Sequence, residues 1–274
     1  MSRRVAFLGP LGTYNDEAAR RYAPDADRVP YPSLPHVGAA FEAGEVDEAV
    51  VPIENSLYGS VTDMVDFLIS AGRARIRGEL LLPIEHCLIA RPGVSISDLR
   101  KILSHPQALG QCRGYLAATL PDAEQVATVS TAAAVADLQQ GDDSAAAIAP
   151  RRAAEMYGLE ILAEGIQDSS NNITRFVILG TEDHPRTGHD KTSIAFDFVR
   201  GDQPGLVYAA LRPFADRGIN LTKIESRPTG SELGSYMFLL DFDGHREDPL
   251  VREALEEIGR HASTLKVLGS YPRA

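Results

Sequence analysis

The sequence predicts an α/β protein built from two domains of different type. Up to about residue 180, short apolar runs alternate with amphipathic helical stretches, which is typical of an α/β domain. The remaining segments follow the order strand, helix, strand, strand, helix, strand, which is the ferredoxin-like βαββαβ arrangement. Residues 181–191 between them carry no apolar side chain. We therefore divide the chain into a domain at 1–182, a linker at 183–191 and a domain at 192–274.

The elements of the first domain follow from the spacing of its apolar residues. Strands are expected at 5–8, 48–52 and 145–149, with an extended segment at 80–90 and a strand ending at Leu103. Helices are expected at 15–22, 35–43, 61–71 and 132–140, and a further helix begins at Pro106, because proline is favoured at the first helical position.

The second domain shows the same two periodicities. Ile194, Phe196 and Phe198 alternate with other residues as half-buried strand residues should. Gly218 is placed to end the first helix. The expected elements are strands at 192–200, 219–227, 235–243 and 264–270, and helices at 205–217 and 249–261.

Composition excludes several classes of function. The net charge is −11 and the pI about 5.1, which argues against a nucleic-acid surface and means that an anionic ligand must be held by local groups. No apolar run is long enough for a signal peptide or a membrane span. Two cysteines and seven scattered histidines predict no disulfide framework, and no metal site is expected. We expect a cytoplasmic protein without cofactors.

Hydroxyl and amide residues follow the strands at four predicted helix starts. Such residues usually cap helices, and for any single site that explanation is sufficient. Helix N-termini also bind anions, and in open α/β sheets they gather at the carboxyl ends of the strands. Together the four starts suggest a cleft for a small molecule with more than one carboxylate. The residues concerned are Thr13 and Asn15, then Asn55, Ser56, Ser60 and Thr62, then Ser104, and finally Ser130 and Thr131.

A run of polar residues at 169–175, interrupted only by Ile173, leads directly into the apolar residues 176–179. It could be a solvated loop before a strand. It also places amides, the Thr174 hydroxyl and the Arg175 guanidinium together, and Arg175 is a natural carboxylate clamp. Glu54, after an apolar strand, is a candidate acid or part of a helix start. Gln107 and Gln111 share one helix face, and which of them faces a cleft is open.

These stretches together resemble one family. The motifs are Gly9-Pro10-Leu11-Gly12-Thr13-Tyr14, Pro52-Ile53-Glu54-Asn55-Ser56, Ser104-His105-Pro106-Gln107, Ser130-Thr131, Asn171-Asn172-Ile173-Thr174-Arg175-Phe176, Pro204-Gly205-Leu206-Val207 and Glu225-Ser226-Arg227-Pro228. Their joint order resembles prephenate dehydratase with a C-terminal ACT regulatory domain.

The resemblance implies a catalytic domain like a periplasmic binding protein, with two α/β lobes around a cleft. We place the crossings between the lobes near residues 78 and 165. The implied reaction converts prephenate to phenylpyruvate with loss of carbon dioxide and water. The resemblance implies that Thr174 is catalytic, and from their chemistry we add Arg175 and Glu54 as catalytic candidates. The implied substrate-binding residues are Thr13, Asn55, Ser56, Ser104, Gln107, Ser130, Thr131, Asn172 and Phe176.

The resemblance also implies regulation. The ACT domain would bind L-phenylalanine between the subunits of a homodimer or homotetramer. The residues implied for this are Pro204, Gly205, Leu206, Val207, Glu225, Ser226, Arg227 and Pro228. Deleting residues 192–274 is expected to leave some activity and to abolish the phenylalanine response.

Two alternatives stay open. Arogenate dehydratase performs the same elimination on the amino-acid form of the substrate, and no residue in the sequence separates the two. A protein without catalysis, which only senses amino acids or binds solutes, would also suit two lobes and an ACT domain.

Overall fold

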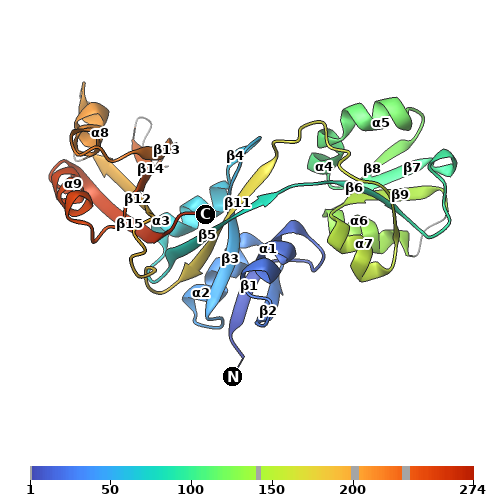
Figure 1. Cartoon of the computed structure of the whole chain (residues 1–274), viewed down its shortest axis with the longest axis horizontal. Coiled ribbons are helices and arrows are strands. Elements are labelled where there is room, and N and C mark those ends of the chain that lie inside the picture. Colours follow the sequence, from blue (N-terminus) through green and yellow to red (C-terminus); the bar gives the residue numbers. More distant parts are fainter. Residues whose placement is uncertain (1, 140–142, 199–203, 230–234) are drawn as a thin grey trace.

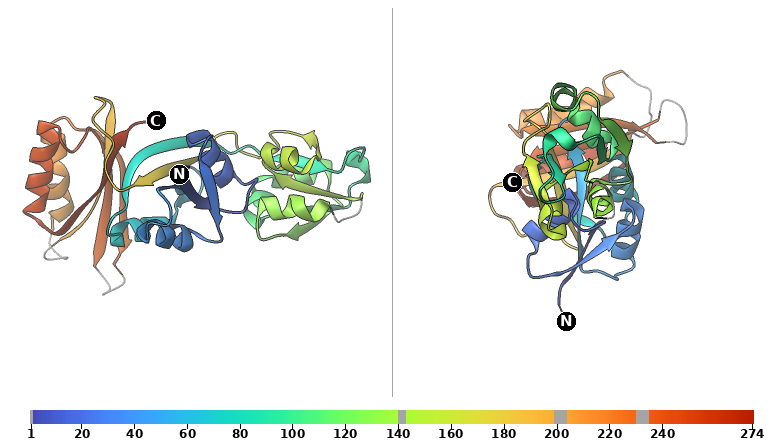
Figure 2. Two further views of the ribbon diagram at one scale, coloured as in Figure 1. Left: turned by 90° about the horizontal axis from the view of Figure 1, so that it is seen from below. Right: turned by 90° about the vertical axis from the view of Figure 1, so that its right-hand side faces the viewer.

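The structure, a computed structural model, describes residues 2–139, 143–198, 204–229 and 235–274. It consists of three α/β units in a row (Figure 1). Figure 2 shows the C-terminal domain and the second lobe at opposite ends, with the first lobe between them. The predicted fold class is therefore confirmed: two α/β lobes and a separate βαββαβ domain.

The first lobe is built on one mixed sheet. Its strand order is β2 (Asp27–Tyr31), β1 (Arg4–Leu8), β3 (Glu48–Asn55), β11 (Ile173–Gly180) and β5 (Arg75–Pro83), and the short β4 (Gly59–Ser60) pairs with β3. The helices are α1 (Tyr14–Tyr22), α2 (Leu34–Glu42) and α3 (Thr62–Ser70). In α2, Val37, Ala40 and Phe41 recur at helical spacing and are buried against the sheet.

The second lobe has a five-stranded sheet in the order β10 (Glu160–Ala163), β6 (Cys87–Ala90), β9 (Ala145–Ala149), β7 (Lys101–Ser104) and β8 (Glu124–Ala127). Its helices are η1 (Ile96–Asp98), α4 (Pro106–Gln111), α5 (Arg113–Thr119), α6 (Thr131–Leu138) and α7 (Arg151–Tyr157). Strand β9 is buried along its whole length. The edge strands β2 and β8 were not predicted, because their polar and half-exposed residues show no apolar run.

The chain crosses between the lobes twice. Residues 84–86 connect β5 to β6, and residues 164–172 return from β10 to β11. The first crossing differs from the expected position, because Gly78 lies inside β5 and pairs with Ile178. Apolar residues of both strands lie within 80–90, and only Pro83, Glu85 and His86 mark the break between them. The second crossing begins close to residue 165.

The C-terminal domain contains β12 (Asp190–Phe198), α8 (Leu206–Asp216), β13 (Leu221–Pro228), β14 (Tyr236–Asp243), α9 (Pro249–Gly259) and β15 (Ala262–Pro272). Its antiparallel sheet has the order β13-β14-β12-β15. The two helices cover the outer face, and the other face packs on the first lobe (Figure 2). The expected ends of one strand at Arg200 and of one helix at Gln140 lie outside the described residues.

The C-terminal domain and the first lobe share a hydrophobic core. Leu239, Leu268 and Tyr271 belong to the same buried cluster as Leu68 and Ile76 of the first lobe. The backbones of β15 and β5 approach so closely that a Cβ atom at Gly269 would lie 2.0 Å from the carbonyl oxygen of Ile76. Within the described segments, no helix is long and apolar enough to cross a lipid bilayer.

Candidate active site

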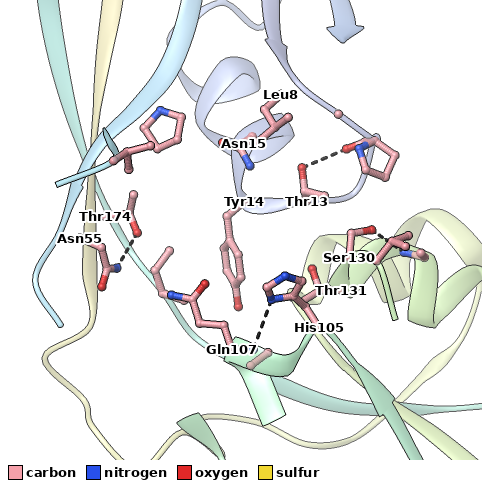
Figure 3. A pocket seen from close by; sticks show the side chains of 18 of the residues that line it. Leu8, Thr13, Tyr14, Asn15, Asn55, His105, Gln107, Ser130, Thr131 and Thr174 are labelled. Atoms are coloured by element: carbon pink, nitrogen blue, oxygen red, sulfur yellow. Dashed lines mark hydrogen bonds between the residues drawn. The ribbon is translucent and has the colours of Figure 1, made fainter. Parts of the chain in front are cut away.

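A cleft of about 550 Å³ lies between the two lobes. The first lobe lines it from β1, the start of α1, β3 and β11, and the second lobe from α4 and the start of α6 (Figure 3). Of the residues predicted to bind substrate or act on it, eight line this cleft: Thr13, Asn55, Gln107, Ser130, Thr131, Asn172, Thr174 and Phe176.

Helix N-termini from both lobes border the cleft. The Thr13 hydroxyl caps α1 by accepting from the backbone N–H of Asp16, and the Ser130 hydroxyl caps α6 by accepting from that of Ala133 at 3.0 Å. The capping explanation therefore holds for both side chains. Capping by these side chains is compatible with anion binding, because other backbone N–H groups at each helix start and the positive end of the helix dipole can still act on an anion.

The Thr174 hydroxyl is oriented by Asn55. The Asn55 amide Nδ2 donates to Thr174 Oγ1 at 2.9 Å (Figure 3). The same Nδ2 donates to Asn172 Oδ1 at 2.8 Å. The Asn55 Oδ1 accepts from the backbone N–H groups of Leu57 and Tyr58, which fixes the direction of the amide. Because Thr174 Oγ1 accepts from Asn55, its own O–H is directed elsewhere and can donate into the cleft.

The same hydrogen-bond chain continues into the second lobe. Asn172 Nδ2 donates to Gln111 Oε1 at 3.0 Å, and His86 Nε2 lies 2.6 Å from the same oxygen. His86 Nδ1 lies 2.9 Å from the hydroxyl of Tyr14. Desolvation by burial lowers the pKa of His86, which favours a neutral imidazole. With Gln111 Oε1 as acceptor, the neutral ring carries its proton on Nε2.

Tyr14, His86 and Gln111 were not among the predicted site residues. Gln111 shares a helix face with Gln107, and both line the cleft. Tyr14 ends the motif Gly9-Pro10-Leu11-Gly12-Thr13-Tyr14, in which the sequence predicted a site role only for Thr13. His86 lies in the first crossing, where nothing in the local sequence separates it from the other scattered histidines.

Arg175 and Glu54 do not line the cleft, contrary to the prediction. Adjacent strand residues point to opposite faces of a sheet, so Arg175 follows Thr174 onto the face that meets the C-terminal domain. There Arg175 Nη1 lies 2.6 Å from Asp241 and 3.4 Å from Glu54. The same alternation turns Glu54 away from the cleft while its neighbour Asn55 enters it. Neither charged group is placed to contact a ligand there.

Two predicted serines are also placed away from the cleft. The Ser104 hydroxyl is fully buried and donates to the carbonyl of Ile148 at 2.6 Å, while His105 caps α4 instead. The Ser56 hydroxyl donates to the carbonyl of Asn171 and accepts from the N–H of Ile173. Ser56 therefore holds the end of the second crossing, next to Thr174, by two hydrogen bonds.

The described lining residues of the cleft include no lysine, arginine, aspartate or glutamate. An anionic ligand would be held by helix N-termini, hydroxyls and amides. The positive dipole ends of these helices would favour negative charge in the cleft without a fixed cation.

Two family models match the chain. The model for prephenate dehydratase matches residues 5–184, which is the part that forms the two lobes and the cleft. The chain belongs to the prephenate dehydratase family. The model for the ACT domain matches residues 192–260, within the βαββαβ domain. The predicted resemblance is confirmed.

Individual members of the prephenate dehydratase family are similar over nearly the whole chain. A prephenate dehydratase of Mycobacterium bovis is 41% identical and matches 98% of this chain and 87% of its own. An arogenate dehydratase/prephenate dehydratase of Arabidopsis thaliana is 42% identical, over 98% of this chain and 72% of its own. The crystal structure of a prephenate dehydratase from Arthrobacter aurescens, in complex with L-Phe, is 42% identical with a TM-score of 0.90, covering 99% and 90% of the two chains.

The structure separates the residues expected to bind an effector into two groups. Pro204, Gly205, Leu206 and Val207 form the start of α8, where Gly205 has φ +88° and Val207 is exposed. On β13, Ser226 and Pro228 are exposed, but Glu225 contacts Ser60 and Arg227 contacts Asp66 of the first lobe. Arg227 lies 3.0 Å from Asp66. Glu225 and Arg227 therefore contact the catalytic domain, which the prediction did not foresee.

Proposed function

We propose that this protein is a carbon–oxygen lyase that converts prephenate to phenylpyruvate. The observation that carries the proposal is the Thr174 hydroxyl, which accepts from Asn55 and is free to donate into a cleft bordered by helix N-termini. Family membership supports the same activity. The activity serves phenylalanine biosynthesis in the cytoplasm.

Prephenate is a dianion, and its ring becomes aromatic when the ring carboxylate and the C4 hydroxyl both leave. The C–C bond to the carboxylate breaks, its electron pair enters the ring, and the C4–O bond breaks. The departing hydroxide takes a proton from Thr174 and leaves as water, and solvent then returns a proton to Thr174. One proton is consumed for each carbon dioxide and water released. General-acid assistance of this kind contributes roughly 10²–10⁴-fold.

The remaining cleft residues would bind and orient the substrate. The starts of α1 and α6 lie on opposite lobes and would each hold a carboxylate. Phe176, which lines the cleft and is only 1% exposed, would form an apolar wall beside the ring. A less polar wall favours loss of the ring carboxylate, because the charge is dispersed as carbon dioxide forms.

The lining favours prephenate over arogenate. Arogenate carries an ammonium group where prephenate carries a keto group, and an ammonium calls for a carboxylate partner. None of the described lining residues is an aspartate or glutamate. The expected result is a higher kcat/KM for prephenate when both compounds are assayed, with phenylpyruvate or phenylalanine as the products followed.

Thr174→Val tests the catalytic assignment, because valine is nearly isosteric but lacks the hydroxyl. We expect kcat to fall by about 10²–10⁴-fold, and Thr174→Ser to retain most of the activity. Wild-type kcat in the valine variant would contradict the role of Thr174. Binding of prephenate without turnover by the wild-type protein would instead support a sensing or solute-binding function.

We further propose that L-phenylalanine regulates the enzyme through the ACT domain. The Arthrobacter structure is a complex with L-Phe, and here the α8 start and the exposed face of β13 offer apolar groups such as Val207 and Ile224 to a second subunit. A homodimer or homotetramer would place these surfaces together. Phenylalanine titration of the activity and sedimentation with and without phenylalanine test the two parts of this proposal.

A further inference from the structure

Strand β11 connects the cleft to the C-terminal domain through two consecutive residues. Thr174 points into the cleft, and Arg175 points into the contact with the C-terminal domain. Arg175 is only 9% exposed. Its Nε donates to Glu79 at 2.7 Å, its Nη1 to Asp241 at 2.6 Å, and its Nη2 to the Tyr271 hydroxyl at 2.7 Å. One guanidinium therefore joins the first lobe to β14 and β15.

These partners are themselves held in one arrangement. The Ser193 hydroxyl donates to Asp241 at 2.6 Å and lies 2.6 Å from the Tyr271 hydroxyl. Lys191 donates to Glu79 at 2.8 Å. We call these six residues the interdomain ion cluster. Separating a buried charge from its partner is costly. Movement of one side chain in the cluster should therefore move the side chains paired with it.

The electrostatics keep Arg175 charged in this position. Burial by itself would lower the pKa of Arg175, but Tyr271, Asp241 and Glu79 together raise it well above its ordinary value. The guanidinium therefore stays charged throughout the pH range in which the protein is folded.

A second arm leads from Arg175 to the strand that carries Glu225-Ser226-Arg227-Pro228. Glu54 lies 3.4 Å from Arg175 and 3.6 Å from Lys223 of β13. Lys223 also donates to Ser60 at 2.7 Å and lies 3.4 Å from Glu225. The charged contacts thus run without interruption from β13 to the residue next to Thr174.

We propose that Arg175 is a positioning residue whose partners Asp241 and Tyr271 hold Thr174 at its place in the cleft, and that Lys223 and Glu54 transmit movement of β13 to it. The inference rests on the proposed function and specifies its regulation. The C-terminal domain then completes the catalytic centre, although none of its residues lines the cleft in the part that the structure describes.

Two conservative substitutions test the positioning role. Tyr271→Phe removes one hydroxyl and keeps the buried ring, and Asp241→Asn removes one charge. We expect kcat for prephenate to fall about tenfold or more with KM little changed, because displacement of a reacting group by about 1 Å costs up to roughly 100-fold. Arg217→Gln is the matched control, since Arg217 pairs with Glu253 and Glu257 inside the C-terminal domain.

Lys223→Gln tests the transmitting arm. The concentration of phenylalanine that gives half-maximal inhibition should rise at least about fivefold, which is the lower end of typical allosteric coupling. Hydrogen exchange of the β11 amides supplies a readout independent of turnover. Phenylalanine should change the exchange rate in the wild-type protein and in Arg217→Gln, and this change should be lost in Lys223→Gln.

Each variant is checked for folding by circular dichroism and assayed well below its melting temperature. Unchanged kcat in Tyr271→Phe and Asp241→Asn, together with unchanged inhibition in Lys223→Gln, would overturn the proposal even if their melting temperatures fall. If Asp241→Asn does not fold, the other two variants decide. Wild-type protein without turnover of prephenate, or without inhibition by phenylalanine, would refute the proposed function instead.

Discussion

Asn55→Asp is the sharpest test of the hydrogen-bond chain in the cleft. The substitution keeps the oxygen that accepts from Leu57 and Tyr58, so the turn after β3 should be preserved. It replaces the donating Nδ2 with an acceptor 2.8 Å from Asn172 Oδ1 and 2.9 Å from Thr174 Oγ1. The Thr174 O–H would then donate to the new carboxylate instead of to the substrate.

The magnitude follows from three contributions. Loss of the donating hydroxyl removes a general-acid effect of roughly 10²–10⁴-fold in kcat. Loss of the hydrogen bond to Asn172 destabilises the site by about 1 kcal/mol. If a substrate carboxylate binds about 6 Å from the new carboxylate, their repulsion adds about 3 kcal/mol at an effective dielectric constant of about 20, or roughly 100-fold in binding. We expect kcat to fall at least about 100-fold and kcat/KM roughly 10⁴-fold.

The assay is steady-state formation of phenylpyruvate at saturating and at low prephenate concentration. Asn171→Asp is the control, since it makes the same chemical change at an exposed residue two positions from Ile173 that does not line the cleft. If Asn55→Asp keeps kcat within about threefold of wild type while the control behaves normally, Asn55 does not direct the Thr174 hydroxyl and the reasoning fails.

Three further predictions concern stability and reactivity. Gly269→Ala should lower the melting temperature by roughly 6–12 °C, because the new Cβ would lie 2.0 Å from the Ile76 carbonyl oxygen. Gly259→Ala, where the nearest contact of the new Cβ is 3.8 Å, should change the melting temperature little. Calorimetry measures both. Burial lowers the pKa of His86, so below about pH 6.5 the unfolded protein binds more protons than the folded one. The free energy of unfolding should therefore fall as the pH drops below that value. His86→Gln should lose this part of the pH dependence in thermal unfolding. Burial raises the pKa of Cys87 to about 11 and of Cys112 to about 12, so a thiol reagent at pH 8 should react with the denatured protein much faster than with the folded one.

The sequence predicted the elements near the cleft better than the directions of their side chains. The junctions at Thr13, Asn55 and Ser130 were predicted from turn and cap chemistry, which is local. Thr174 and Arg175 were grouped because they are adjacent, but β11 is a central strand with both faces covered. When both faces of a strand are buried, polar residues on each face can serve different partners, and only the tertiary structure shows which.

The hydrogen-bond chain could not be predicted from the sequence. Its members Tyr14, His86, Gln111, Asn172 and Asn55 come from α1, the first crossing, α4, the second crossing and β3. Their contacts join residues up to 117 positions apart. Such pairs carry no periodicity and no common motif, so nothing in the local sequence brings them together. Ser104 shows the reverse case: it suits a cap by sequence, but the strand end is buried and His105 takes the cap.

The shared core changes how regulation should be tested. Deletion of residues 192–274 was expected to leave activity and remove the phenylalanine response. That deletion would uncover Leu68 and Ile76 and leave Arg175 without its partners Asp241 and Tyr271. Breaking one buried ion pair typically costs about 3–5 kcal/mol, and the exposed core adds to this.

An inactive truncated protein would therefore not separate loss of regulation from loss of the fold. Lys223→Gln with its control Arg217→Gln separates them, because each removes one lysine or arginine charge and leaves the shared core intact. A truncated protein that melts as cooperatively as the full chain and keeps wild-type kcat would show that the C-terminal domain is a detachable regulator. A large drop in melting temperature with a fall in kcat is the result that the interdomain ion cluster predicts.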